Sequence, residues 1–243
     1  MATTDETPVK KSSQNESGHA INVANFSQLV TEIKSFSADY NPSSDILKVA
    51  NLETLRDSAK TALNSMHQAD SVYRDAINKR QLEFDKMSSL VTRISGAVKA
   101  AGVDSKVKEE ISSLNKKIKG GGIKSETTEN SHSTSQMSYD NRLNNFTQLV
   151  VKLKGIPEYK PNEASLAPDS LDAYINSLAQ VTESADKAWS ELDRARSERD
   201  RLLYSDINNL VPVALRVKEY TKSLYGTKSR EYKAVSALKF KNN

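Results

Sequence analysis

The chain of 243 residues contains no cysteine, eight glycines and six prolines, and only 6% of its residues are aromatic. Without cysteine it can form no disulfide, offers no thiolate nucleophile and has no thiolate ligand for a metal ion. Scarce glycine and proline mean few obligatory turns and few helix breakers. These absences exclude thiol chemistry and favour long amphipathic helices over sheets.

Long hydrophobic runs are also missing. No stretch of about 18 consecutive apolar residues occurs, which is the length that a membrane-spanning helix requires. Residues 1–22 are polar and lack the basic and then apolar order of a signal peptide. We therefore predict a soluble, cytoplasmic protein without a transmembrane segment, with export by a dedicated machine as an open alternative.

Charge of one sign is only slightly in excess. The formal net charge is +4, and residues 25–119 and 145–243 each carry an excess of three positive charges. A nucleic-acid interface requires Lys and Arg gathered on one face, whereas runs such as Arg194–Arg201 alternate in sign as a solvated helix face does. The sequence thus gives nucleic-acid binding little support and leaves it as an alternative.

Two long stretches carry apolar or small residues at a seven-residue spacing, which is typical of a helix that packs one seam against a partner. The repeated rows are Leu52, Ala59, Met66 and Tyr73 and, 119 residues later, Leu171, Leu178, Ala185 and Leu192. We therefore predict an all-α protein with two homologous helical-bundle repeats and long heptad-patterned helices.

The duplication extends to the segments before these rows. Asn25–Lys34 has apolar residues at helical spacing and returns as Asn145–Lys154. A Tyr-x-Pro sequence follows each copy, beginning at Tyr40 and at Tyr159, where proline ends the helix. Each repeat is therefore expected to start with a short helix and a loop.

Capping and breaking residues predict where the helices begin and end. Asn51 and Ser170 suit the N-cap position of the long helices, and Gly102 and Gly226 suit positions just past a helix end. We also expect a break or kink near Met87 and near Ser205; the alternatives are a tight turn in both copies or a kink within one long helix of about 50 residues, since the segment at Met87 contains no breaker.

These boundaries predict four parts. Residues 1–22 form a disordered polar tail, and residues 23–119 form the first helical repeat. Residues 120–144 are a flexible linker rich in Gly, Ser and Thr, and residues 145–243 form the second repeat. A linker of this kind allows the repeats either to pack together or to sit apart.

Candidate catalytic and metal sites are few. Glu16-x-x-His19 and Glu129-x-x-His132 match the spacing of carboxylate-bridged metal sites, but such sites need the motif on a helix facing a bundle interior. Both motifs lie in the predicted tail and linker. Because no Ser/His/Asp constellation and no acid pair in an apolar setting is evident, we predict a non-enzymatic protein with no cofactor and no metal site.

Aromatic residues gather in the last third of the sequence. They are Trp189, Tyr204, Tyr220, Tyr225 and Tyr232. Tyr and Trp favour interfaces because they bury a large area while keeping one polar tip. We treat these five as a candidate interface, with packing inside the second repeat as the competing interpretation.

The same region resembles a family of uncharacterised bacterial helical proteins of similar length. The resemblance is carried by Leu202-Leu203-Tyr204, Leu210-Val211, Val217-Lys218-Glu219-Tyr220, Lys222-Ser223-Leu224-Tyr225-Gly226 and Tyr232-Lys233-Ala234-Val235-Ser236. It implies a duplicated all-helical fold and leaves the function open. The first copy departs from it, with Ala100-Ala101-Gly102 where the second has Leu224-Tyr225-Gly226.

Two similar units in one chain can offer two similar surfaces. We therefore expect a structural or interaction protein, a duplicated scaffold or self-assembling subunit whose partner is itself or another protein. One alternative is a basic helical protein associated with nucleic acid. The other is a membrane-active or secreted helical effector.

Overall fold

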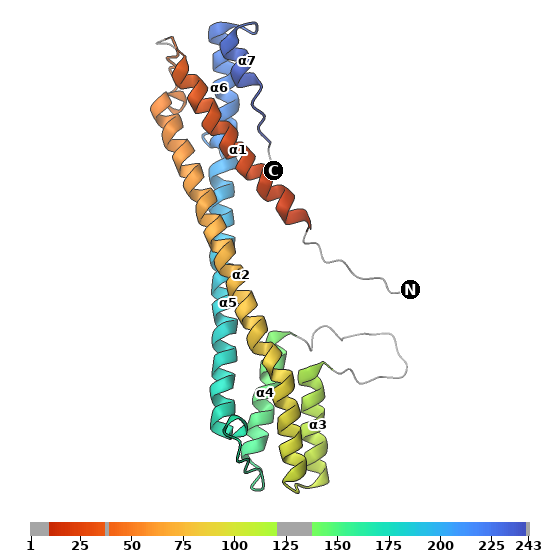
Figure 1. The fold of residues 1–243 in the computed structure, drawn as a ribbon. Coiled ribbons are helices and arrows are strands. Elements are labelled where there is room, and N and C mark those ends of the chain that lie inside the picture. Colours follow the sequence, from red (N-terminus) through yellow and green to blue (C-terminus); the bar gives the residue numbers. More distant parts are fainter. Residues whose placement is uncertain (1–9, 37–38, 121–137, 242–243) are drawn as a thin grey trace, which may run out of the picture. The chain divides into compact units, whose positions relative to one another are not determined.

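The computed structural model describes residues 10–36, 39–120 and 138–241 (Figure 1). These residues form seven α-helices and no strand, so the all-α class is confirmed for this part of the chain. The elements are α1 (Lys10–Ser35), the short 3-10 helix η1 (Asp45–Leu47), α2 (Val49–Ala100), α3 (Ser105–Lys119), α4 (Tyr139–Lys154), the 3-10 helix η3 (Ala164–Leu166), α5 (Pro168–Tyr204), α6 (Leu210–Tyr225) and α7 (Arg230–Ser236).

The chain divides into two compact units. Unit 1 takes its described residues from Met1–Ser71 and Ser190–Asn243, and unit 2 is Val72–Trp189. Each long helix is shared between the units. The first part of α2 and the last part of α5 belong to unit 1, and the last part of α2 and the first part of α5 belong to unit 2. The units therefore do not coincide with the predicted ranges 23–119 and 145–243, because each unit combines segments from both of them.

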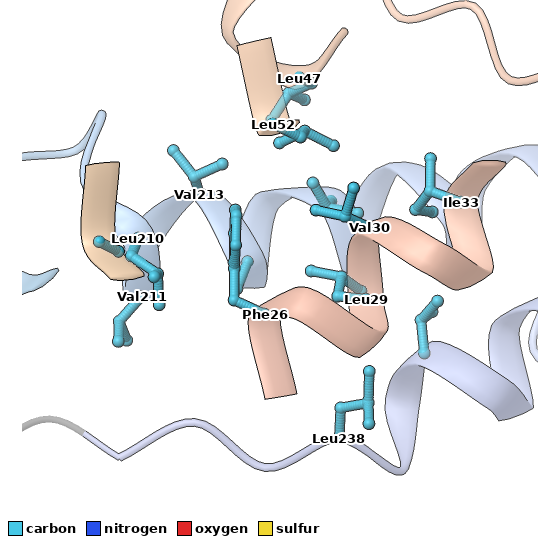
Figure 2. Packing of buried hydrophobic residues seen from close by; sticks show 14 of the residues in the cluster. Phe26, Leu29, Val30, Ile33, Leu47, Leu52, Leu210, Val211, Val213 and Leu238 are labelled. Carbon is cyan, nitrogen blue, oxygen red and sulfur yellow. The ribbon is translucent and has the colours of Figure 1, made fainter. Parts of the chain in front are cut away.

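The core of unit 1 forms where the apolar face of α1 meets α6. Figure 2 shows side chains of both helices pointing toward one another, together with Leu47, Leu52 and Leu238. The α1 residues are at most 1% exposed, as expected for a buried face at helical spacing. The side chains at the centre are Phe26, Leu29, Val30 and Ile33 from α1 and Leu210, Val211 and Val213 from α6.

The core of unit 2 is built in the same way from α2, α3, α4 and α5. Most of its fully buried residues are spaced by three, four or seven positions along each helix, which places them on one face. They include Phe84, Met87, Val91 and Ile94 from α2, Ile111 and Ile118 from α3, Phe146, Leu149, Val150 and Leu153 from α4, and Leu171 and Leu178 from α5.

The predicted N-caps of the long helices are wrong by three residues. Helix α2 begins at Val49 and α5 at Pro168, so Asn51 and Ser170 lie inside the first turns. The Asn51 amide instead donates a hydrogen bond to the carbonyl of Asp45 at 2.7 Å. Proline suits the first helical position because it has no N–H to leave unpaired there.

Among the described helices a break occurs near Ser205 but not near Met87, where the alternative of one long helix holds. Helix α5 ends at Tyr204 and α6 begins at Leu210, whereas α2 continues through Met87 to Ala100. Met87 is fully buried in a segment without a helix breaker, so continuing the helix keeps it in the core. Gly102 and Gly226 follow their helices with φ of 72° and 81°, as predicted for glycine past a helix end.

The C-terminal parts of the predicted tail (1–22) and of the predicted linker (120–144) are helical. Helix α1 begins at Lys10, inside the range 1–22, and residues 1–9 lie outside the described part of the chain. Helix α4 begins at Tyr139, where the Ser138 side chain accepts the N–H of Asn141. The central residues of the predicted linker, 121–137, also lie outside the described residues.

Candidate functional site

A tyrosine in each unit bonds to the 3-10 helix that precedes a long helix. The Tyr40 hydroxyl donates to the carbonyl of Leu47 at 3.0 Å, and the Tyr159 hydroxyl donates to the carbonyl of Leu166 at 2.9 Å. Burial raises the pKa of both hydroxyls, to about 12 for Tyr159, where Glu163 adds to the effect. The neutral tyrosines therefore hold η1 and η3 in place.

An ion pair recurs next to these loops. The Lys34 ammonium lies 2.7 Å from a carboxylate oxygen of Glu53, and the Lys154 ammonium lies 2.5 Å from Asp172. Both acids are the fifth residue of a long helix and lie at the start of its second turn. Each pair therefore ties the end of a short helix, α1 or α4, to the start of the long helix that follows it.

An arginine in each unit joins the two predicted repeats. The Arg93 guanidinium on α2 donates to the Ser165 hydroxyl at 2.9 Å, and Arg216 on α6 donates to the Ser44 hydroxyl at 3.1 Å. Each arginine comes from the second half of one repeat. Each serine lies in the loop or 3-10 helix of the other repeat.

A pocket lies beside each of these arginines. The pocket of unit 1 has a volume of about 690 Å³ and is lined by Arg216, by Leu47 from η1 and by Tyr232 from α7. The pocket of unit 2 has a volume of about 560 Å³ and is lined by Arg93 and by Leu166 from η3. Both pockets thus form where a helix from one repeat meets the 3-10 helix of the other.

Apolar groups and charges of both signs line the two pockets. In unit 1 the half-exposed Leu215 lies beside Lys218 and Glu219, and burial lowers the pKa of the Lys218 ammonium. In unit 2 the lining includes Glu158 and Lys160. This mixture is the usual make-up of a protein–protein contact surface, in which apolar groups are ringed by polar ones.

The five aromatic residues of the candidate interface lie in both units. Tyr220 packs edge-on against Tyr40 with ring centroids 5.2 Å apart, and Tyr225 packs edge-on against Phe36 at 5.6 Å. Tyr204 and Tyr232 are also partly buried against the core of unit 1, and Tyr232 reaches the pocket.

Trp189 differs from the four tyrosines. It belongs to unit 2, is 46% exposed, and contacts Tyr73 with ring centroids 5.3 Å apart. The structure therefore brings the tyrosines together around unit 1 and leaves the tryptophan on the surface of unit 2.

A buried polar network in unit 1 was missed by the sequence analysis. The Tyr204 hydroxyl lies 2.7 Å from Nδ1 of His19 and accepts a hydrogen bond from the Asn22 amide at 3.1 Å. Asn22 also exchanges two hydrogen bonds with the backbone of Lys241, at 2.8 and 3.0 Å. This network fastens the C-terminal segment to α1.

A sequence signal for this network existed. His19 and Asn22 stand seven and four residues before Phe26, so they continue the buried face of α1 backward. The polar composition of residues 1–22 predicted a tail there, although the spacing of His19 and Asn22 continues the buried face. Such buried polar groups are stable when every member has a hydrogen-bond partner.

Two further searches bear on the alternatives considered above. In the described residues no group of three or more His, Asp or Glu side chains is placed to hold a metal ion. The helices of the described ranges also contain no segment long and apolar enough to cross a lipid bilayer.

Comparisons with known proteins give no relative. No protein-family model matches the chain, and no curated protein or solved structure matches it.

Proposed function

We propose that this chain is a non-enzymatic structural protein, a duplicated helical scaffold that assembles with copies of itself through one pocket on each unit. The proposal includes the duplication predicted from the sequence. It is carried by one observation, the recurrence of the arginine pocket in both units.

The spacing of the matched residues supports the duplication. Tyr40 and Tyr159 differ by 119 positions, as do Leu47 and Leu166, and their hydrogen bonds are the same. Arg93 and Arg216 differ by 123 positions. The offset therefore grows from 119 to 123, that is, by four residues. The extra residues lie in the turn between α5 and α6, because α2 is continuous and has no such turn.

Two similar pockets on one chain favour assembly for a simple reason. A subunit with a single contact surface stops at a dimer, whereas a subunit with two can join a neighbour at each and form rings or filaments. Each contact also raises the effective concentration of the next one. A duplicated pocket is therefore more useful to a scaffold than to a protein that binds one partner once.

The test is the mass of the purified protein in solution over a wide concentration range, by light scattering, with electron micrographs of the same samples. We expect the wild-type mass to grow above 26.9 kDa as the concentration rises. Arg93→Ala or Arg216→Ala alone should stop growth at small oligomers, because one pocket remains. The double variant should stay monomeric.

Arg230→Ala is the matched control, because Arg230 is exposed on α7 and lies outside both pockets. It should assemble like the wild type. A wild-type chain that stays monomeric throughout would contradict the proposal, and so would a double variant that assembles as well as the control.

A further inference from the structure

A groove in unit 2 lies between the last turns of α2 and helix α3. It has a volume of about 360 Å³ and is lined by four lysines, Lys99 from α2 and Lys108, Lys116 and Lys119 from α3. Hydroxyl and amide side chains make up most of the remaining lining, and no carboxylate is among its described lining residues. The small net charge of the whole chain gives no sign of this local concentration of positive charge.

Two contacts fix the register of the groove. The Lys119 ammonium donates to the Thr92 hydroxyl at 2.6 Å, and the Asn115 amide donates to the Ser95 hydroxyl. The helices therefore run antiparallel, with Lys99 beside the first turns of α3. Lys99 and Lys108 mark one end of the groove, and Lys116 lies about 12 Å further along α3, at 1.5 Å per residue.

The positive charge of the groove is not neutralised by neighbours. Among the described residues, the three groove lysines other than Lys119 have neither an ion pair nor a hydrogen-bond acceptor for their ammonium groups. Glu110 on the same helix is paired with Lys152 of α4. Like charges held together in this way attract an anion, because it relieves their repulsion.

The floor of the groove is polar and incompletely bonded. Asn115 is only 7% exposed, and its carbonyl oxygen has no hydrogen-bond partner in the described part of the chain. The Ser95 hydroxyl is engaged as a donor to the carbonyl of Val91 at 2.9 Å. A buried acceptor without a partner is costly, so this floor calls for a hydrogen-bond donor such as a water molecule; a phosphate oxygen, which is also an acceptor, does not satisfy it.

Two of the groove lysines have no lysine at the matching positions of the predicted second repeat. The glycines that end α2 and α6 are 124 positions apart, and this spacing relates Lys108 to Tyr232 and Lys116 to Phe240. Aromatic residues thus replace two of the lysines. The lysines of unit 2 are therefore not a feature that the duplication itself requires. The two arginine pockets proposed above do not depend on them.

We propose that this groove binds the phosphate groups of a single-stranded nucleic acid. Lysine is a point charge that contacts phosphate oxygens without reading bases. Charges at both ends of the groove fit a chain of phosphates better than a lone phosphate. No aromatic residue lines the groove among those described, so the contacts are to phosphates, which carry no sequence information.

The test measures fluorescence anisotropy of a labelled oligothymidylate of about 20 nucleotides, at about 50 mM salt and upward. The groove variant is Lys99→Gln, Lys108→Gln, Lys116→Gln and Lys119→Gln in the full chain. The control variant is Lys60→Gln, Lys79→Gln, Lys106→Gln and Lys117→Gln, four exposed lysines outside the groove. Both variants lower the net charge equally, and circular dichroism checks that both are folded.

We expect the affinity of the groove variant for the oligonucleotide to fall by about tenfold or more, and that of the control variant to stay within about twofold of the wild type. For single strands the slope of log K against log salt is about −0.7 per neutralised phosphate, so loss of three or four contacts should reduce it by roughly 2 to 3. In a nitrogen–proton spectrum, the side-chain amide signal of Asn115 should move on titration.

Equal losses in the two variants would overturn the proposal, because net charge alone would then explain binding. Absence of binding by the wild type at low salt would overturn it as well. Tripolyphosphate is the second probe: if it binds the groove as tightly as the oligonucleotide does, the ligand is a free polyphosphate and the nucleic-acid assignment is wrong. None of these outcomes bears on self-assembly.

Discussion

At the scale of single residues, the hydrogen bonds of Tyr40 and Tyr159 test how alike the two units are. We expect Tyr40→Phe and Tyr159→Phe each to lower the free energy of unfolding by about 1 kcal/mol, because each leaves a carbonyl without its donor. Urea denaturation measures the loss. Tyr73→Phe is the control and should change stability by less than about 0.5 kcal/mol; unequal losses at the two sites would count against matched roles.

The same tyrosines make stability depend on alkaline pH. Burial raises the pKa of Tyr159 to about 12 from an ordinary value near 10, and it raises the pKa of Tyr40 as well. The fold favours the neutral hydroxyls, so their contribution is fully present below about pH 10 and is lost as the pH rises toward 12.

We therefore expect the double variant Tyr40→Phe/Tyr159→Phe to lose less stability than the wild type between about pH 10 and 12. Part of the loss should remain, because burial also raises the pKa of Tyr174 to about 12. Denaturation curves followed by circular dichroism at each pH give the answer. Parallel losses in the two proteins would mean that other groups cause the alkaline unfolding.

Much of the burial could be predicted residue by residue. Three residues of the first heptad row, Leu52, Ala59 and Met66, are at most 1% exposed, as the spacing indicated, whereas the fourth, Tyr73, is only partly buried. His19 and Asn22 could not be identified by composition, because a polar residue is stable in a core only when distant partners such as Tyr204 supply hydrogen bonds. A single sequence does not reveal such partners.

At the scale of secondary-structure elements, the two copies differ at the end of the long helix. The copy with Ser205–Asn209 breaks, and the copy with Met87 continues as α2. Sequence alone predicted the first correctly because it contains turn residues and Pro212 just beyond. Near Met87 the sequence left two outcomes open, a turn or one long helix of about 50 residues, because no local breaker is present there; the structure has the long helix, α2.

A proline scan tests this difference. Ser89→Pro should lower the free energy of unfolding by about 3 kcal/mol or more, because Ser89 lies inside α2 and proline removes a helical hydrogen bond there. Ile207→Pro should cost less than about 1 kcal/mol, because Ile207 is 69% exposed in the turn between α5 and α6. Chemical denaturation of both variants measures the costs, and similar values would show that α2 is interrupted as well.

At the scale of the whole molecule, neither unit could be assigned from the sequence. Periodicity identifies the apolar face of each helix. It does not say whether that face packs against a helix of the same predicted repeat or of the other one. Contacts such as Arg93 with Ser165, and Arg216 with Ser44, decide for pairing across repeats. The pockets were missed for the same reason, because each pocket takes its arginine and its leucine from different repeats.

Pairing across repeats predicts the behaviour of one repeat by itself. Residues 139–243 contain α4, η3, α5, α6 and α7, and their halves belong to different units in the full chain. We expect this fragment to form a dimer in which each half packs on the partner's other half, with a melting temperature that rises with concentration. Analytical ultracentrifugation measures the mass, and a folded monomer would count against the exchange.

The most direct test of the account uses engineered cysteine pairs in the full chain, which has no cysteine of its own. Arg93→Cys/Ser165→Cys and Ser44→Cys/Arg216→Cys each join two repeats within one unit, whereas Ser44→Cys/Arg93→Cys joins two units within one predicted repeat. A short bismaleimide should cross-link the first two pairs within a single chain and leave the third pair uncross-linked. Efficient cross-linking of the third pair, with failure of the first two, would contradict the account. Each repeat would then fold upon itself, and the two pockets, which are lined by residues of both repeats, would not exist.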